Sequence, residues 1–397
     1  MKRWNKHLVL ILVVLFTMGI AVGCGGGGGE SEEGAADENI KIGINYVLSG
    51  EAATFGSHTR DGVMLAFEEI NEAGGVLGKQ IQALERDNQG KLDEAVSIAT
   101  KLITEENIVV HMGPVTTGPT LAVTSICSQY QIPLLTASAT HPDVTVDPET
   151  GKVRDYIFRI CFTDPPQAIV GADFAYNDLK AKNVAIYYDN TNDYSKGLAK
   201  EFKANFEALG GKIVAEEGYG KDDEDFRPTL TSFINAGADV VYVPGYYQKV
   251  GKIVAQGREL GIDVPFLGAD GWDSPDLIKI AGAENLNNCF FTNHYSSKDP
   301  SEKVQNFVKA YKEKYGTEPG SFAALGYDAA YLVADAIERA GSTEPEDIKN
   351  ALAETKDFEA VTGTLSFDEN HNPIKEIAII ELVNGEQTLK TKIAPTK

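Results

Sequence analysis

Hydrophobic positions along the chain alternate between short β-rich runs and amphipathic helical segments. The run at 40–44 predicts a strand, and apolar residues recur on one helical face over 56–71. Strands at 80–86 and 108–112 and a helix over 92–103 continue the alternation. Strands that take turns with helices predict βαβ units and parallel sheets covered on both faces. The sequence therefore predicts an α/β fold with doubly wound parallel sheets.

A second round of the same pattern begins after the apolar run at 156–160. We expect its strands at 184–188, 213–215, 240–243 and 265–268, and its helices near 196–209, 226–235 and 250–260. Later helical patterns exceed what a second sheet needs, so we expect them to return to the first lobe. The segment 363–367 then crosses back, and 377–382 ends in the second lobe.

Several crossings between two lobes would form a hinge with a cleft at the carboxyl ends of the strands. The predicted N-terminal lobe comprises residues 39–161 plus 293–363. The predicted C-terminal lobe comprises residues 162–292 plus 364–397.

The N-terminus has the features of a targeting signal. Lys2, Arg3 and Lys6 precede an apolar run at 8–22, which is shorter than the roughly 20 residues of a membrane span. Small residues and then Cys24 follow, which resembles a bacterial lipoprotein signal. We therefore expect residues 1–23 to be removed and Cys24 to carry a lipid. Ordinary secretion with an incidental Cys24 is the alternative.

Residues 24–38 are rich in Gly and Glu and lack apolar periodicity, so they predict a flexible tether. Together with the lipid, this tether would hold the protein outside the cytoplasm, at the cell membrane. The full chain carries a net charge of -22. Such an acidic chain argues against nucleic acid as a partner and against contact with anionic lipid.

The stretch 113–120, Gly-Pro-Val-Thr-Thr-Gly-Pro-Thr, follows an apolar run and precedes a helical pattern. Thr117 occupies an N-cap position, and Pro119 suits a first helical turn. Free backbone N–H groups at a helix start favour an anion. A second hydroxyl cluster, 136–140, follows the next apolar run, and we expect the two turns to hold a carboxylate together.

Sequence motifs of enzymes are not found in this chain. It has no His-Glu-x-x-His, Cys-x-x-Cys, Gly-x-Ser-x-Gly or Walker pattern, so we expect no catalytic residues, metal or cofactor. His111, His141, His294 and His371 are interpreted as satisfied or solvated. An extracytoplasmic enzyme remains the less favoured alternative. The three cysteines after Cys24 allow at most one internal disulfide, and we expect them to be buried thiols.

Several segments carry a family resemblance in their order and spacing: GINYVLSGEAATFG, INEAGGVLGKQIQALERDN, GPVTTGPT, IPLLTASATHP, VVYVPGYY and FLGADGWDSP. In these segments the chain resembles the branched-chain amino-acid binding proteins of ABC importers, of the periplasmic binding protein type 1 class. The resemblance spans about 40–382. It implies two doubly wound lobes joined by a three-crossing hinge.

The resemblance also implies how an amino acid would be held. On the first lobe, Thr117 matches a hydroxyl at the helix start, Ser138 a position offering main-chain polar atoms, and Thr140 a second hydroxyl. Across the cleft, Tyr246 and Asp270 match the tyrosine and the acid that close on the ligand. Asp270 stands where well-known members have glutamate. A zwitterion needs donors for its carboxylate and an anionic acceptor for its ammonium.

The walls of the side-chain pocket are implied to be Phe55, Val115, Thr116, Tyr194 and Phe322. To these we add Trp272, because a large aromatic residue in a polar turn suggests a contact surface, although packing on its own lobe is the alternative. Phe55 and Tyr194 have the same alternative, while Asp270 and Thr117 could simply cap their turns.

Taken together, these features predict a binding protein that captures a branched-chain or other apolar amino acid by lobe closure. The predicted partner is an ABC permease in the membrane, and the protein is expected to be a monomer. Two alternatives remain open: a two-lobed sensory module, and a binding protein for another small acid or amide.

Overall fold

A computed structural model describes residues 39–394 of the chain. The predicted signal peptide, the tether and Cys24 lie outside the described residues, as do residues 395–397. Between residues 39 and 394, no helix has both the length and the apolar character needed to cross a membrane.

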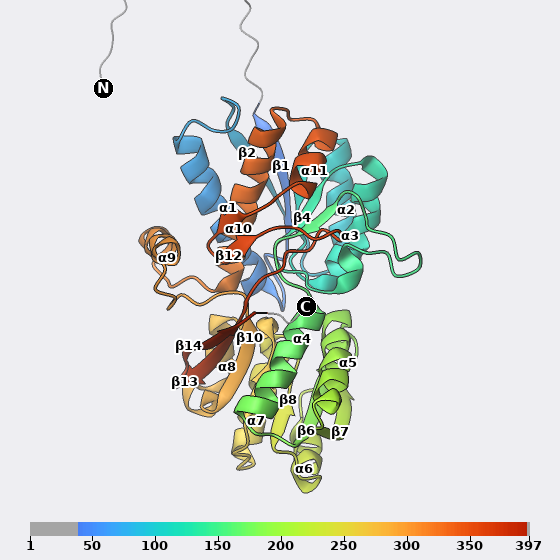
Figure 1. Cartoon of the computed structure of the whole chain (residues 1–397), viewed down its shortest axis with the longest axis vertical. Helices are drawn as coiled ribbons and strands as arrows, with labels where there is room; N and C mark the ends of the chain where they lie inside the picture. The colour runs from blue at the N-terminus through green and yellow to red at the C-terminus, as the bar shows by residue number, and fades with distance from the viewer. Residues whose placement is uncertain (1–38, 395–397) are drawn as a thin grey trace, which may run out of the picture. The chain divides into compact units, whose positions relative to one another are not determined.

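Five parallel strands form the first sheet in the spatial order β2-β1-β3-β4-β5. Its central strands are almost wholly buried, as is usual for a parallel sheet covered on both faces. The strands are β1 (Ile40–Tyr46), β2 (Ile81–Asp87), β3 (Val110–Met112), β4 (Leu134–Thr136) and β5 (Ile157–Arg159). Helices α1 (Ala53–Glu72), α2 (Leu92–Thr104) and α3 (Thr117–Tyr130) connect them, and the short helix η1 (Pro142–Val144) precedes β5 (Figure 1).

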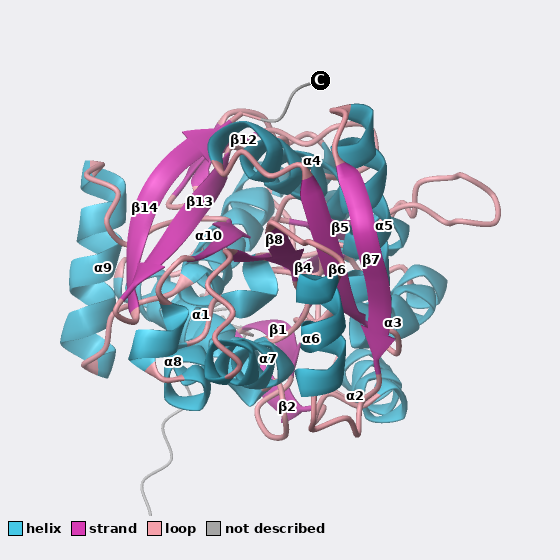
Figure 2. Ribbon diagram, turned by 90° about the horizontal axis from the view of Figure 1, so that it is seen from below, coloured by secondary structure: helices cyan, strands magenta, loops and turns pink. Residues whose placement is uncertain are grey.

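Seven strands form the second sheet in the order β14-β13-β10-β9-β8-β6-β7. They are β6 (Asn183–Asp189), β7 (Lys212–Tyr219), β8 (Val240–Tyr242), β9 (Phe266–Gly268), β10 (Cys289–Asn293), β13 (Ile377–Val383) and β14 (Glu386–Ile393). The accompanying helices are α4 (Asp164–Asp173), η2 (Phe174–Asp178), α5 (Asp193–Ala208), α6 (Arg227–Asn235), α7 (Tyr247–Glu259), η3 (Asp270–Trp272), α8 (Pro275–Ala281) and η4 (Ala283–Leu286). Figure 2 shows β14 and β7 at opposite edges of this sheet.

The chain then returns to the first sheet through α9 (Glu302–Tyr315), α10 (Ser321–Ala340) and α11 (Pro345–Ala353). Helices α1 and α10 pack closely enough for their main chains to meet. A Cβ atom on Gly62 would lie 2.0 Å from the Ala323 carbonyl oxygen, and one on Gly326 would lie 2.2 Å from that of Thr59. Only glycine allows this approach. The hairpin β11 (Phe358–Ala360) and β12 (Gly363–Leu365) follows, before the chain enters β13.

Two details differ from the sequence prediction. Thr116 is the residue before α3 and Thr117 is its first helical residue, so the N-cap was placed one residue too late. The second sheet is mixed, because β13 pairs antiparallel with β10 and with the unpredicted edge strand β14. Of the cysteines in the described part of the chain, Cys127, Cys161 and Cys289 are buried and free, as expected.

Candidate functional site

The carboxyl ends of strands from both sheets meet at one cavity. The turn after β3 and the one after β4 supply residues from the first sheet, while the turns after β8 and β9 supply residues from the second. The cavity is lined by Phe55, Val115, Thr116, Thr117, Ser138, Tyr194, Tyr246, Asp270, Gly271 and Phe322. The structure thus brings together all the predicted site residues except Thr140 and Trp272.

The first-sheet side of the cavity is a turn fixed by internal hydrogen bonds. Gly113 has a φ of +94°, and a Cβ atom there would meet the Tyr46 ring at 2.5 Å, so the turn needs glycine. The hydroxyls of Thr136 and Thr120 both donate to the Pro114 carbonyl oxygen, at 2.7 and 3.0 Å. Ser138 donates to the Val115 carbonyl oxygen at 2.8 Å. These bonds hold the start of α3, with its N–H groups, at the cavity.

The second-sheet side carries the acid. Asp270 is only 2% exposed. Its Oδ1 accepts a hydrogen bond from the Tyr194 hydroxyl at 2.7 Å, and its Oδ2 lies 3.1 Å from His294 Nε2. Its main-chain N–H donates to Gln167 Oε1 at 2.9 Å. Burial raises the pKa of Tyr194 well above its ordinary value, so the phenol keeps the proton that it donates.

Aromatic rings form the walls. Phe55 stacks on Phe322 with ring centroids 4.3 Å apart, and meets Tyr246 edge to face at 5.4 Å. Tyr246 in turn stacks on Tyr194 at 5.2 Å. Phe55 comes from α1 and Phe322 from α10, the two helices whose main chains touch. Phe55 and Tyr194 thus lie in helices α1 and α5, and their buried rings line the cavity. Tyr194 also packs on its own lobe, through Tyr246 and Asp270.

Thr140 lies behind the cavity wall, next to an acid that sequence reasoning did not select. The main-chain N–H of Asp164 donates to the Thr140 carbonyl oxygen at 3.0 Å. Within residues 39–394, the Thr140 hydroxyl and both Asp164 carboxylate oxygens are buried without a hydrogen-bond partner. Burial raises the pKa of Asp164 to about 8; the adjacent Thr140 hydroxyl opposes this rise, and Asp270 adds to it.

Asp164 and His294 were not anticipated as site residues from the sequence. An acid at a helix start is a usual capping residue, and a histidine after a strand is usually solvated. Asp164 begins α4, where such an acid needs no ligand to explain it. His294 follows β10 and is buried beside Asp270, stacked on Phe162 with centroids 3.7 Å apart. Only the order of strands in the second sheet places β10 next to β9, which leads into Asp270.

Trp272 is not a contact surface, which corrects the sequence prediction. Its side chain is fully buried, and its indole Nε1 donates to the Val243 carbonyl oxygen at 2.9 Å. A Cβ atom on Gly268 would lie 2.0 Å from the indole, so the ring covers the main chain of β9. Trp272 therefore belongs to the core of the second lobe, because an indole with its N–H satisfied inside gains most by burial.

A wider groove adjoins the cavity and shares Thr116 and Tyr246 with it. Its other walls come from both lobes and are mostly polar, including Glu51, Lys91 and Asp193. The groove therefore borders the cavity at Thr116 and Tyr246.

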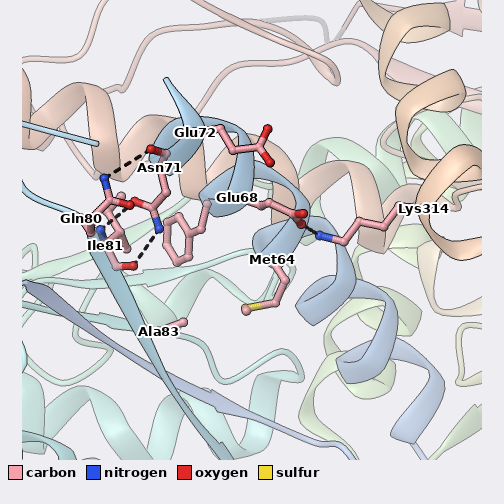
Figure 3. A pocket seen from close by; sticks show the side chains of 9 residues that line it. Met64, Glu68, Asn71, Glu72, Gln80, Ile81, Ala83 and Lys314 are labelled. Atoms are coloured by element: carbon pink, nitrogen blue, oxygen red, sulfur yellow. Dashed lines mark hydrogen bonds and ion pairs between the residues drawn. The ribbon is translucent and has the colours of Figure 1, made fainter. Parts of the chain in front are cut away.

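Another hollow lies away from these residues, between α1, β2 and α9 (Figure 3). Its polar groups bond to one another: Asn71 bonds to both the N–H and the carbonyl oxygen of Ile81, and Glu68 pairs with Lys314. These bonds attach α1 to β2 and to α9, so the polar groups of the hollow stabilise the packing of these elements. Among the described residues, no group of three or more His, Cys, Asp or Glu side chains is suited to hold a metal ion.

Comparison with known proteins gives one consistent result. The family model described as "Periplasmic binding protein" matches residues 39–387. A Leucine-, isoleucine-, valine-, threonine-, and alanine-binding protein of Pseudomonas aeruginosa is 30% identical over 334 residues, which cover 84% of this chain and 87% of the relative.

Solved structures agree with this relative. The branched-chain amino acid transporter substrate binding protein LivJ of Streptococcus pneumoniae, in complex with isoleucine, is 38% identical with a TM-score of 0.84, covering 90% of this chain and 100% of that one. The leucine binding protein LivK of Thermotoga maritima is 34% identical with a TM-score of 0.84, covering 90% and 99%. The predicted fold of two α/β lobes is thereby confirmed, and the chain belongs to the periplasmic binding protein family.

Proposed function

We propose that this protein binds an α-amino acid with an apolar side chain in the cavity and delivers it to an ABC permease. One observation carries the proposal: neutral hydrogen-bond donors at the start of α3 lie across the cavity from the Asp270 carboxylate. Only a ligand with a negative and a positive end satisfies both sides at once. The aromatic walls between them suit an apolar side chain.

The roles of individual residues follow from this orientation. The Thr117 hydroxyl and the first N–H groups of α3 would receive the ligand's carboxylate. Asp270 and the main chain of Ser138 would receive the ammonium, whereas Thr140 lies behind the cavity wall and would not touch it. Asp164, buried beside Thr140, is a second acid near this end of the site.

The remaining cavity residues would surround the ligand's side chain. They are Phe55, Val115, Thr116, Tyr194, Tyr246 and Phe322. Trp272 has no part in this set, because it is enclosed in the second lobe.

Capture is proposed to occur by closure of the two lobes, residues 39–161 plus 293–363 and residues 162–292 plus 364–397. Hydrogen bonds already link them beside the cavity: the Tyr247 hydroxyl donates to the Glu51 carbonyl oxygen at 2.9 Å, and the Thr54 hydroxyl donates to Asp276 Oδ2 at 2.5 Å. A ligand that contacts both lobes binds the closed form better and so shifts the equilibrium toward it.

The cellular setting is part of the proposal. A lipid on Cys24 and the tether at 24–38 would keep the monomeric binding protein on the outer side of a membrane, near its permease. Metabolic labelling with a radioactive fatty acid tests this point, because Cys24→Ser should abolish the label.

Binding is tested by a thermal-shift screen of the common amino acids, followed by titration calorimetry on those that stabilise the protein. We expect branched-chain and other apolar amino acids to raise the melting temperature, since a ligand that binds only the folded state stabilises it. The absence of a shift with any α-amino acid would contradict the proposal.

A further inference from the structure

Asp270, the acid proposed to close on the ligand's ammonium, is itself held by an imidazole. His294 Nε2 lies 3.1 Å from Asp270 Oδ2, and both side chains are almost fully buried, with 0% and 3% exposure. The Tyr194 hydroxyl holds the other carboxylate oxygen at 2.7 Å. Two donors thus fix the plane of the carboxylate.

The His294 ring has little freedom to move. It stacks on Phe162 with centroids 3.7 Å apart and an interplanar angle of 25°. The main-chain N–H of His294 donates to Asn293 Oδ1 at 2.9 Å. Phe162 lies between β5 and α4, and His294 lies between β10 and α9. Both residues therefore belong to segments that join the two lobes, so the hinge itself positions the imidazole.

The protonation state of the ring follows from its neighbours. A neutral imidazole with its proton on Nε2 donates to Asp270, while Nδ1 is buried without a partner in the part of the chain that the structure describes. Burial lowers the pKa of His294, an effect that Asp270 and Asp273 oppose and Lys375 reinforces. The ring is therefore neutral near pH 7, and acidification makes it a cation.

An imidazolium at this place would compete with the ligand. Asp270 can neutralise one nearby cation, and a protonated His294 and a ligand ammonium would both need it. Building on the proposed function, we propose that His294 is a positioning residue of the amino-acid site. It holds the Asp270 carboxylate toward the cavity, and protonation of its imidazole weakens amino-acid binding. Affinity should then fall as the pH drops through the titration of His294.

Other ionisable groups near this pair must be separated from His294. Asp164 also faces Asp270, but its pKa is raised to about 8, so its titration centres on mildly alkaline pH. Burial lowers the pKa of Lys375 to about 8, so this residue is already a cation at acidic pH. Neither group gains a proton across the acidic range in which His294 does.

The test is titration calorimetry with L-isoleucine at pH 7.5 and pH 5.0. Wild-type protein should bind more weakly at pH 5.0 than at pH 7.5, by up to about tenfold for each pH unit below the titration of His294, since one proton is linked to binding. His294→Gln keeps an amide donor that does not titrate, so it should bind normally at pH 7.5. Its affinity should not fall between pH 7.5 and pH 5.0, so the weakening of binding by acid (the acid weakening) should be lost. His294→Ala should bind about tenfold more weakly at pH 7.5, having lost a hydrogen bond to a charged group.

His371 provides a matched control. It also stacks on a phenylalanine, Phe158, at 4.2 Å, and bonds to a carbonyl oxygen instead of an acid. His371→Gln should bind and respond to pH as wild type does. Thermal melts at both pH values show that each variant is folded, and Asp164→Asn should keep the acid weakening.

Acid weakening that persists in His294→Gln would overturn the inference, as would its loss in Asp164→Asn alone. If the His294 variants do not fold, the wild-type protein decides: calorimetry at pH 5.5 in two buffers of different ionisation enthalpy should show proton release on binding, and no release overturns the inference. Wild-type protein that binds no amino acid at either pH would overturn the proposed function as well, whereas wild-type binding with unaltered His294 variants refutes only the inference.

Discussion

The two sides of the cavity hold a ligand by different chemistry. On the first-lobe side, the lining residues are neutral: Phe55, Val115, Thr116, Thr117, Ser138 and Phe322. On the second-lobe side, Asp270, Tyr194 and Tyr246 are ionisable, and Asp164 and His294 stand behind them.

This difference separates two tasks. Hydrogen bonds from the Thr136 and Ser138 hydroxyls to main-chain carbonyl oxygens fix the neutral side, and these donors have the same strength at every ordinary pH. The ionisable side contains charges whose balance depends on pH and on a ligand's own charge. Substitutions on the first side should therefore change affinity uniformly, whereas those on the second should also change how affinity or stability responds to pH.

The largest effect is expected for Asp270→Ala. It leaves the ligand's ammonium buried without a counter-charge, which should cost about 2 to 5 kcal/mol of binding free energy in calorimetry. Asp263→Ala, an exposed acid on the same lobe, is the control and should bind normally. An unchanged affinity in Asp270→Ala would show that this acid does not contact the ligand, and the proposed difference between the two sides of the cavity would then be wrong.

Next comes Thr117→Val, which removes a hydroxyl from the neutral side at nearly constant volume. Loss of a hydrogen bond to a carboxylate should cost about 1.5 to 3 kcal/mol of binding free energy. The same cost is expected at pH 5 and pH 8, because the hydroxyl does not titrate. Ser125→Ala on the exposed face of α3 serves as the control. A cost that varies with pH would contradict the assignment of this side as the neutral one.

A change in stability is expected for Asp164→Asn. The folded protein keeps the Asp164 proton up to about pH 8, whereas the ordinary aspartate pKa is 3.8. Unfolding therefore releases this proton between those values, and wild-type stability falls as the pH rises through them. Asn resembles the protonated acid, so the variant should gain about 1 to 2 kcal/mol of unfolding free energy at pH 7.5.

Thermal and urea unfolding of the Asp164 variant at pH 7.5 and pH 4 provide the measurement. The gain should almost vanish at pH 4, because this pH is close to the ordinary aspartate pKa of 3.8 and ionisation of the unfolded acid then contributes little free energy. An equal gain at both pH values would mean that the substitution acts through packing alone.

The smallest effect is expected for Tyr194→Phe. The variant loses the hydroxyl that donates to Asp270 and accepts from the Gly271 N–H at 3.0 Å, yet it keeps the ring stacked on Tyr246. Asp270 retains His294, so binding free energy should fall by only about 0.5 to 1.5 kcal/mol. A loss as large as that of Asp270→Ala would show that Tyr194 contributes far more than orientation.

Most of the fold followed from the sequence, because the helices are long enough to display their periodicity and short apolar runs between them mark the buried strands. The edge strand β14 was missed: its alternating exposed residues, such as Lys390 and Lys392, lack the apolar run that marks the buried strands. Its antiparallel neighbour β13 was placed correctly in the second lobe, but periodicity carries no information on strand direction.

The cavity-lining residues were recoverable because they lie in turns whose order and spacing resemble those of a family. The sequence did not reveal which of the polar-turn and loop residues are buried. A tryptophan in the polar turn Gly271-Trp272-Asp273 looks exposed, and only the structure reveals that Gly268 leaves room for its ring. Likewise, Asp164 and His294 each have an ordinary local explanation, and only the packing of α4 and β10 beside η3 reveals their shared neighbour, Asp270.

The contact of α1 with α10 through Gly62 and Gly326 has a consequence for how such proteins diversify. Gly62 lies about two turns along α1 from Phe55, and Gly326 lies about one turn along α10 from Phe322. These two phenylalanines are the stacked pair in the cavity wall. An alanine at either position would push the helices apart and with them the two rings. The range of ligands accepted by a descendant of this protein can therefore drift through exchanges that never touch a ligand, and comparing only the residues that line the cavity would overlook them.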